Sequence, residues 1–232
     1  MRNKGGFTLI EVMVAVVILA MITLLIWQSS AVTIVTKDRF EKEDDLMHEM
    51  ALTLNRIADD LSMAFILAPT SEFIGKSPSG EVLTKTEFVG QDQGDQDKLT
   101  FNTFSNVRYI KDTKQSDQSE ISYFVEPQED NPGLFNLLKR QSSPLDSLPE
   151  EGGKTLIMME GIKSFNLRYY SEGLNDWIAE WNSTSLENPH KMPKAVEIVI
   201  TVPYPSEELE EEEILTFRTV AFLEMAPGPH GS

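Results

Sequence analysis

The sequence predicts an α+β fold in which one long N-terminal helix packs on antiparallel β-sheet. Three observations support this prediction. The chain opens with a long apolar segment and continues with apolar residues at helical spacing. The second half consists of short runs of alternating residues separated by turn-forming residues. Helices and strands do not alternate along the chain, which excludes a doubly wound parallel sheet.

Composition restricts the class of protein. The chain has 232 residues, of which 41% are hydrophobic and 25% charged, enough for one sizeable core. The formal net charge of -17, without a basic stripe, argues against nucleic acid as a partner. Because there is no cysteine, disulfides and thiolate metal sites are excluded.

The first helical element is a candidate membrane span. Residues Phe7 to Trp27 contain one formal charge, Glu11. At ~1.5 Å per residue, a helix of this length crosses a hydrocarbon core about 30 Å thick. Arg2 and Lys4 precede the span and an acidic chain follows it. The positive-inside rule therefore predicts a cytoplasmic N-terminus and an exported body.

An ordinary secretory signal is the competing interpretation of this segment. Such a signal has a shorter apolar core and a small-residue cleavage site after it. Here the apolar run is longer, residues 28–31 are a weak cleavage site, and the small pair Gly5-Gly6 lies before the run. These features favour a retained helix.

Glu11 is the informative residue of the span. A carboxylate inside an apolar segment costs several kcal/mol without a partner, so it indicates a function. The alternative is a tolerated charge near the membrane interface. If residues 1–6 are removed after Gly6, Phe7 gains a free amine one helical turn from Glu11. The amine of a neighbouring subunit would then neutralise Glu11, which makes it a candidate assembly residue.

The helix is expected to continue beyond the membrane over residues 28–67 and to end at Pro69, as one long bent helix from about Phe7 to Leu67. Polar residues follow Trp27, and an apolar stripe comes next. The stripe suits a helix laid across a sheet, with an interaction face as the alternative. Its members are Leu46, Met50, Leu54, Ile57, Leu61 and Phe65.

Residues 68–225 are predicted to form a β-rich head, and 226–232 a flexible tail. The stretch 69–97 is expected to be loop with at most one short strand. The predicted strands are 99–104, 121–125, 134–140, 155–159, 164–170, 195–202 and 214–223.

The residues from Gly6 to Val12 resemble the leader-peptidase site of type IV pilins and of type II secretion pseudopilins. The glycine, the phenylalanine, the glutamate and an uninterrupted apolar run coincide. The resemblance implies that a prepilin peptidase removes residues 1–6 and N-methylates Phe7.

The later sequence resembles the J-type minor pseudopilins of type II secretion. The shared features are the helix end at 54–61, the strand end at 138–140 and the segment 159–170. Trp177, Trp181 and a proline-led strand at 192–198 follow in the same order.

The J-type resemblance implies a pilin-like fold and a non-enzymatic subunit of the pseudopilus tip, which initiates assembly and helps to export folded proteins. Its implied partners are I-type and K-type minor pseudopilins, with the H type as a further candidate. The implied location is the inner membrane, with a periplasmic head. We expect no cofactor and no metal. The alternatives are a minor pilin of a type IV pilus or competence system, and a signal-anchored periplasmic enzyme.

Other motifs have plainer interpretations. The histidines, His48, His190 and His230, show no ligand or triad spacing. The run at 153–155 imitates the end of a P-loop, but Leu148 occupies the position that requires glycine.

Two acidic segments and the tryptophan pair complete the candidates. The loop with Asp92, Asp95 and Asp97 is expected to be solvated, with calcium binding as the alternative. The acidic run 207–213 is expected to be a solvated hairpin loop, or else a patch for a basic partner. Trp177 and Trp181 are assigned to the core, with an exposed interaction edge as the alternative.

Overall fold

The computed structural model describes residues 8–67, 86–105, 118–143, 152–204 and 214–224. They belong to two compact units, Met1–Met47 with Pro205–Glu207, and His48–Tyr204 with Glu208–Ser232. We call the second unit the head. The predicted leader 1–6, the acidic run 207–213 and the tail 226–232 lie outside the described residues.

Helix α1 runs from Leu9 to Ser62 and contributes to both units. In the first unit, the segment Leu9–Trp27 has a mean hydropathy of 3.0, and its side chains are exposed. By length and composition this segment can cross a membrane. A helix satisfies its backbone hydrogen bonds internally, so an apolar helix of this kind is suited to lipid.

The end of α1 differs from the prediction. The helix ends at Ser62, well before Leu67 and Pro69. The backbone after Ser62 pairs instead with the end of β2 (Lys98–Thr103): Ala64 forms an antiparallel bridge with Thr103. The N–H of Phe65 also donates to Asn102 O at 2.9 Å. This pairing holds the backbone after Ser62 in an extended conformation. The helix therefore ends before it reaches Pro69.

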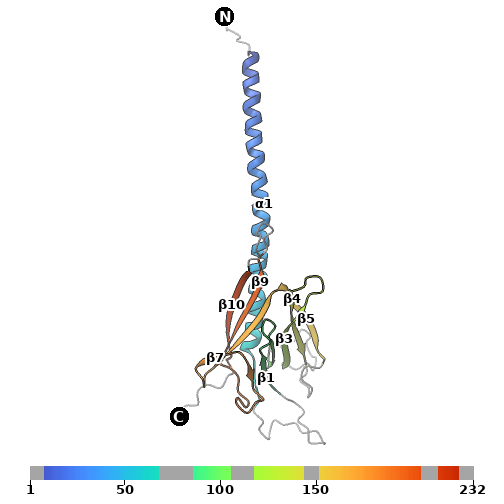
Figure 1. Cartoon of the computed structure of the whole chain (residues 1–232), viewed down its shortest axis with the longest axis vertical. Coiled ribbons are helices and arrows are strands. Elements are labelled where there is room, and N and C mark those ends of the chain that lie inside the picture. Colours follow the sequence, from blue (N-terminus) through green and yellow to red (C-terminus); the bar gives the residue numbers. More distant parts are fainter. Residues whose placement is uncertain (1–7, 68–85, 106–117, 144–151, 205–213, 225–232) are drawn as a thin grey trace, which may run out of the picture. The chain divides into compact units, whose positions relative to one another are not determined.

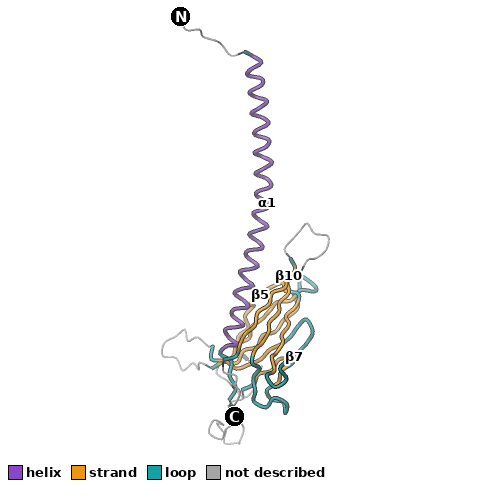
Figure 2. Tube along the Cα trace, turned by 90° about the vertical axis from the view of Figure 1, so that its left-hand side faces the viewer, coloured by secondary structure: helices purple, strands orange, loops and turns teal. Residues whose placement is uncertain are grey.

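The predicted apolar stripe is confirmed as core packing in the head. Met50, Leu54, Ile57 and Leu61 are buried, whereas Leu46 is half-buried and belongs to the first unit. The last turns of α1 lie along one side of the strands (Figure 2). Phe65 is also buried, although it lies beyond the helix.

The described residues of the head form two antiparallel sheets (Figure 1). The first has six strands in the order β5-β4-β3-β2-β1-β8. Its strands are β1 (Phe88–Gln91), β2, β3 (Ser119–Pro127), β4 (Phe135–Ser142), β5 (Lys154–Ile162) and β8 (Trp181–Asn182).

The second sheet has the order β10-β9-β6-β7. Its strands are β6 (Ser164–Ser171), β7 (Asp176–Ile178), β9 (Ala195–Pro203) and β10 (Ile214–Phe222). The chain passes from the first sheet to the second at Lys163, two residues after Gly161 of β5, which has a φ of 72°. Each of the seven predicted strands corresponds to an observed one. The short strands β7 and β8 were not predicted, because two or three residues show no alternation.

The two sheets meet in the core at Gly90 and Tyr169. The Tyr169 ring is fully buried and lies edge-on to Phe88, with ring centroids 6.1 Å apart. A Cβ added to Gly90 would lie 2.0 Å from Tyr169 Oη and 2.1 Å from Cζ. Position 90 therefore requires glycine because the phenol ring occupies the space of a side chain.

Gly90→Ala tests this contact. We expect the free energy of unfolding of the head to fall by about 1–3 kcal/mol, because the rigid ring must move to admit a methyl group. The measurement is urea unfolding of the full-length chain in detergent. Gly173→Ala is the matched control, because a Cβ there meets nothing within 4 Å. Equal stability of the two variants would contradict the assignment.

Candidate assembly site

Helix α1 begins with a reciprocal cap between Thr8 and Glu11. The Thr8 backbone N–H donates to Glu11 Oε2 at 2.9 Å, and the Thr8 hydroxyl donates to the same oxygen at 3.0 Å. In return, the Glu11 N–H lies 3.4 Å from the Thr8 hydroxyl oxygen. The contacts satisfy donors that have no partner inside the helix, and they place negative charge at the positive end of the helix dipole.

The prediction from the sequence treated Glu11 as an assembly residue, with a tolerated charge near the membrane interface as the alternative, and did not include this cap. Its signal is present in the sequence, because Thr-Leu-Ile-Glu at positions 8–11 has the spacing of a capping box. The predicted cleavage residues Gly6 and Phe7 lie outside the described residues. The cap lies entirely after Gly6, so a cut at that point would leave it intact.

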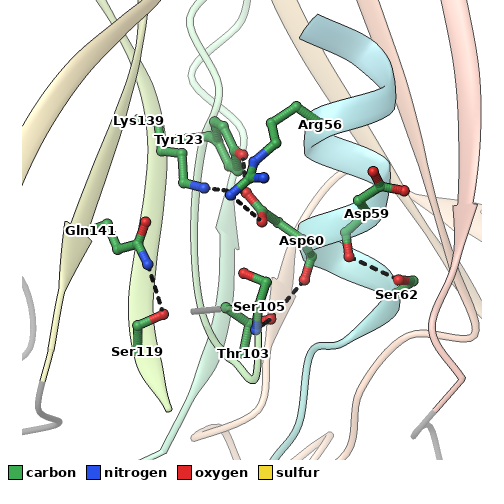
Figure 3. Close-up of polar contacts among 10 residues, drawn as sticks. All are labelled: Arg56, Asp59, Asp60, Ser62, Thr103, Ser105, Ser119, Tyr123, Lys139 and Gln141. Carbon is green, nitrogen blue, oxygen red and sulfur yellow. Dashed lines mark hydrogen bonds and ion pairs between the residues drawn. The ribbon is translucent and has the colours of Figure 1, made fainter. Parts of the chain in front are cut away.

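A buried charge cluster fastens the last turns of α1 to the first sheet (Figure 3). The Asp60 carboxylate accepts a hydrogen bond from Tyr123 Oη of β3 at 2.6 Å and forms an ion pair with Lys139 Nζ of β4. Arg56 lies one turn earlier, with Nη2 3.4 Å from Asp60 Oδ1. The Thr103 hydroxyl of β2 donates to the backbone oxygen of Asp60 at 2.9 Å. One helix residue thus contacts three adjacent strands.

Burial dominates the electrostatics of this cluster. It lowers the pKa of Lys139, although the hydrogen bond and the charge of Asp60 act in the opposite direction. Burial also raises the pKa of Tyr123, and the neighbouring Asp60 carboxylate adds to that shift. Tyr123 is therefore neutral at physiological pH and acts as a hydrogen-bond donor.

A second ion pair lies on the opposite face of the same strands. Arg140 follows Lys139 on β4, and successive side chains of a strand point to opposite faces. Its Nη2 pairs with Glu120, and it lies 3.2 Å from Ser122 Oγ. Its Nη1 donates to Gly152 O at 3.1 Å. The pair ties β4 to β3 and to the turn before β5.

The predicted solvated acidic loop is exposed at Asp92 and Asp95, but the side chain of Asp97 is buried. Its two carboxylate oxygens accept the N–H groups of Gln93 at 2.9 Å and of Leu167 at 2.7 Å. Burial raises the pKa of Asp97, with smaller contributions from Asp92 and Asp95. Asp97 joins the β1–β2 loop to β6. Within the described residues, no group of three His, Cys, Asp or Glu side chains is placed to hold a metal.

The predicted tryptophan pair separates in the structure. Trp181 is buried on β8, and its Nε1–H donates to Lys191 O at 3.0 Å. Trp177 of β7 is half-buried and lies edge-on to Tyr170, with ring centroids 5.4 Å apart. Trp181 therefore belongs to the core, and Trp177 lies at its border.

The histidines stand apart from these clusters. His48 and His190 are exposed, and His190 lies in a turn with a φ of 54°. His230 lies outside the described residues.

Two family comparisons cover most of the chain. Residues 29–207 match the family described as "Type II secretion system (T2SS), protein J". Residues 1–27 match the "Prokaryotic N-terminal methylation motif". The two matches coincide with the two resemblances found in the sequence.

Two solved structures are similar to the chain at low sequence identity. One is a chain of the crystal structure of the GspK-GspI-GspJ complex from the enterotoxigenic Escherichia coli type 2 secretion system. It is 13% identical with a TM-score of 0.50, over 79% of this chain and 99% of that chain. A type IV-like pilin from Thermus thermophilus is 13% identical with a TM-score of 0.46, over 78% and 97%. No curated protein matches the chain. The first structure and the family matches confirm the predicted pilin-like α+β fold.

Asp60→Ala tests the buried cluster. It leaves Lys139 buried without its carboxylate, so we expect the free energy of unfolding to fall by about 3–5 kcal/mol. The double variant with Lys139→Met should recover part of this loss, because no charge is then left without a partner. Asp59→Ala, at an exposed neighbouring position, should change stability by less than about 0.5 kcal/mol. Urea unfolding of the full-length chain would contradict the assignment if Asp60→Ala cost no more than Asp59→Ala.

Proposed function

The chain belongs to the type II secretion system protein J family and is a minor pseudopilin, and we propose that it acts without catalysis at the pseudopilus tip, where it initiates assembly and helps to export folded proteins. The observation that carries the proposal is the family match over residues 29–207, preceded by the methylation motif over 1–27. The proposed partners are minor pseudopilins of the I type and K type, and also the H type.

The family match favours secretion over a type IV pilus or competence system. A signal-anchored periplasmic enzyme is disfavoured by the same match and by the chemistry of the head. Among the described residues, the buried charges form two separate ion pairs, Asp60 with Lys139 and Glu120 with Arg140. Asp97 is occupied by two backbone N–H groups.

Maturation is proposed to begin at Gly6. A prepilin peptidase cuts after Gly6 and N-methylates Phe7, as the motif over residues 1–27 indicates. Because the cap joins Thr8 to Glu11, the start of the helix stays defined in the product. The new amine then lies next to Thr8, close in sequence to the Glu11 carboxylate.

The inner membrane is the proposed location, with the N-terminus cytoplasmic and the head periplasmic. Arg2 and Lys4 precede the apolar segment, and positive residues are retained on the cytoplasmic side. The span is the apolar segment Leu9–Trp27.

Glu11 is proposed to direct assembly in this membrane. Its carboxylate lies in an otherwise uncharged segment, where an unpartnered charge is costly. The amine of Phe7 in a neighbouring subunit would offset that cost. The intramolecular cap supplies only hydrogen bonds, which leaves the negative charge to attract a cation.

Glu11→Leu is expected to reduce co-purification with the I-type and K-type subunits from detergent-solubilised membranes by at least about tenfold, because the charge pair is lost. Secretion should fall in parallel, while the head keeps its unfolding transition. Thr23→Val removes another polar group of the span and is the control. Thr23 only donates to Leu19 O at 2.8 Å, so partner binding should not change.

Thr8→Val separates the two roles of Glu11, because it removes the hydroxyl of the cap and keeps the carboxylate. We expect near-normal assembly for this variant. Losses equal to those of Glu11→Leu would show that capping alone explains the effect. Normal partner recovery and secretion with Glu11→Leu would count against the assembly role.

A further inference from the structure

The second sheet has an outward face that the core does not use. On β9, Val196, Ile198, Ile200 and Val202 point inward and are buried. The alternate residues point outward, and the register aligns them with outward residues of β6, β7 and β10. We call this surface the arginine–aromatic face. Its defining residues are Arg168, Tyr170, Trp177, Arg218 and Phe222.

One end of this face is an apolar row. Phe222 of β10 lies opposite Ala195, which lies opposite Tyr170, and Tyr170 lies opposite Trp177. Phe222 is 67% exposed, and Trp177 is half-buried against Tyr170. In the turn between β6 and β7, Leu174 is 68% exposed. Large apolar side chains thus remain in water at one end of the sheet.

Two arginines lie beside this row and share one carboxylate. Arg218 Nη1 is 3.3 Å from Glu197 Oε1, and Arg168 Nη1 is 3.8 Å from Glu197 Oε2. The side chains of Arg218 and Arg168 are 62% and 52% exposed, whereas that of Glu197 is 11% exposed. One carboxylate balances one of two guanidinium groups, so the cluster retains a positive charge.

That charge contrasts with the rest of the protein. The chain carries a formal net charge of -17. On the described strands β6, β9 and β10, the outward-facing charged residues are Arg168, Arg218 and Glu197, and the edge strand β7 adds the exposed Asp176, which alternates with Trp177. A partner carrying carboxylates is repelled by most of the surface, and here it meets a positive charge.

The residue types also suggest a protein partner. Exposed arginine and aromatic side chains are the types enriched at interface hot spots. Guanidinium groups bind carboxylates in a planar, two-pronged geometry that lysine does not reproduce. Aromatic rings provide large contact area at small entropic cost.

We propose that the arginine–aromatic face docks an acidic segment of a neighbouring pseudopilin. A carboxylate of that segment binds Arg168 and Arg218 from the solvent side, and an adjacent apolar side chain covers Trp177 and Phe222. The inference rests on the proposed function, which supplies pseudopilin partners, and it assigns them a surface on this chain.

The test compares charge reversals at two places. Full-length chain in detergent is titrated with full-length I-type and K-type subunits at about 50 mM and about 500 mM salt. Arg168→Glu with Arg218→Glu should weaken binding of at least one partner by tenfold or more at low salt. The difference in affinity between this variant and the unaltered chain should be smaller at high salt, where exposed charges are screened. Trp177→Ala with Phe222→Ala should weaken the same partner.

Lys154→Glu with Lys191→Glu is the matched control, because both residues are exposed and the change in net charge is the same. It should alter binding by less than about twofold. If the double arginine reversal does not fold, Arg168→Gln leaves Arg218 to balance Glu197 and should still weaken binding about threefold.

The outcomes separate the two proposals. Equal binding by the folded arginine variant and the lysine control overturns the docking face and leaves the proposed function standing. Failure of the unaltered chain to bind either subunit overturns both.

Discussion

The structure of the head depends on the contacts of Asp60. Its carboxylate is buried with Lys139 and Tyr123, and its backbone oxygen holds Thr103. Charges in a protein interior tolerate few alternative arrangements, because a one-residue shift would leave Lys139 without a partner. Apolar packing by Met50, Ile57 and Leu61 supplies burial but is less selective about register. We interpret the ion pair as the feature that selects one register of α1 on the sheet, while apolar burial supplies most of the stabilisation.

A single carboxylate also has more than one role at the start of α1. Glu11 closes the helix terminus through Thr8, yet it remains a negative charge in a segment suited to lipid. Hydrogen bonds lower the cost of placing this carboxylate in an apolar segment, so the helix can form. They do not neutralise its charge, which still favours a cationic partner. Capping and the proposed assembly role are therefore compatible in one side chain, because the cap fixes the position of the carboxylate.

Much of the fold could be predicted from the sequence. The apolar span, the Met50–Leu61 stripe and the long strands follow from periodicity, which local residues determine. The end of α1 did not follow, because tertiary pairing of Ala64 with Thr103 decides it. Asp97 read as solvated, since nothing near it in sequence reveals the N–H of Leu167. The arginine–aromatic face requires the register of four strands, which no single segment contains.

We interpret this chain as a processed, partner-seeking pseudopilin rather than a protein with a simple anchor. Intact-mass analysis of the chain isolated from the inner membrane distinguishes these two interpretations. We expect a product that begins at Phe7 and carries one added methyl group on its amine. A chain that retains residues 1–6, or one that is cut after the apolar segment near Ala31, would contradict it.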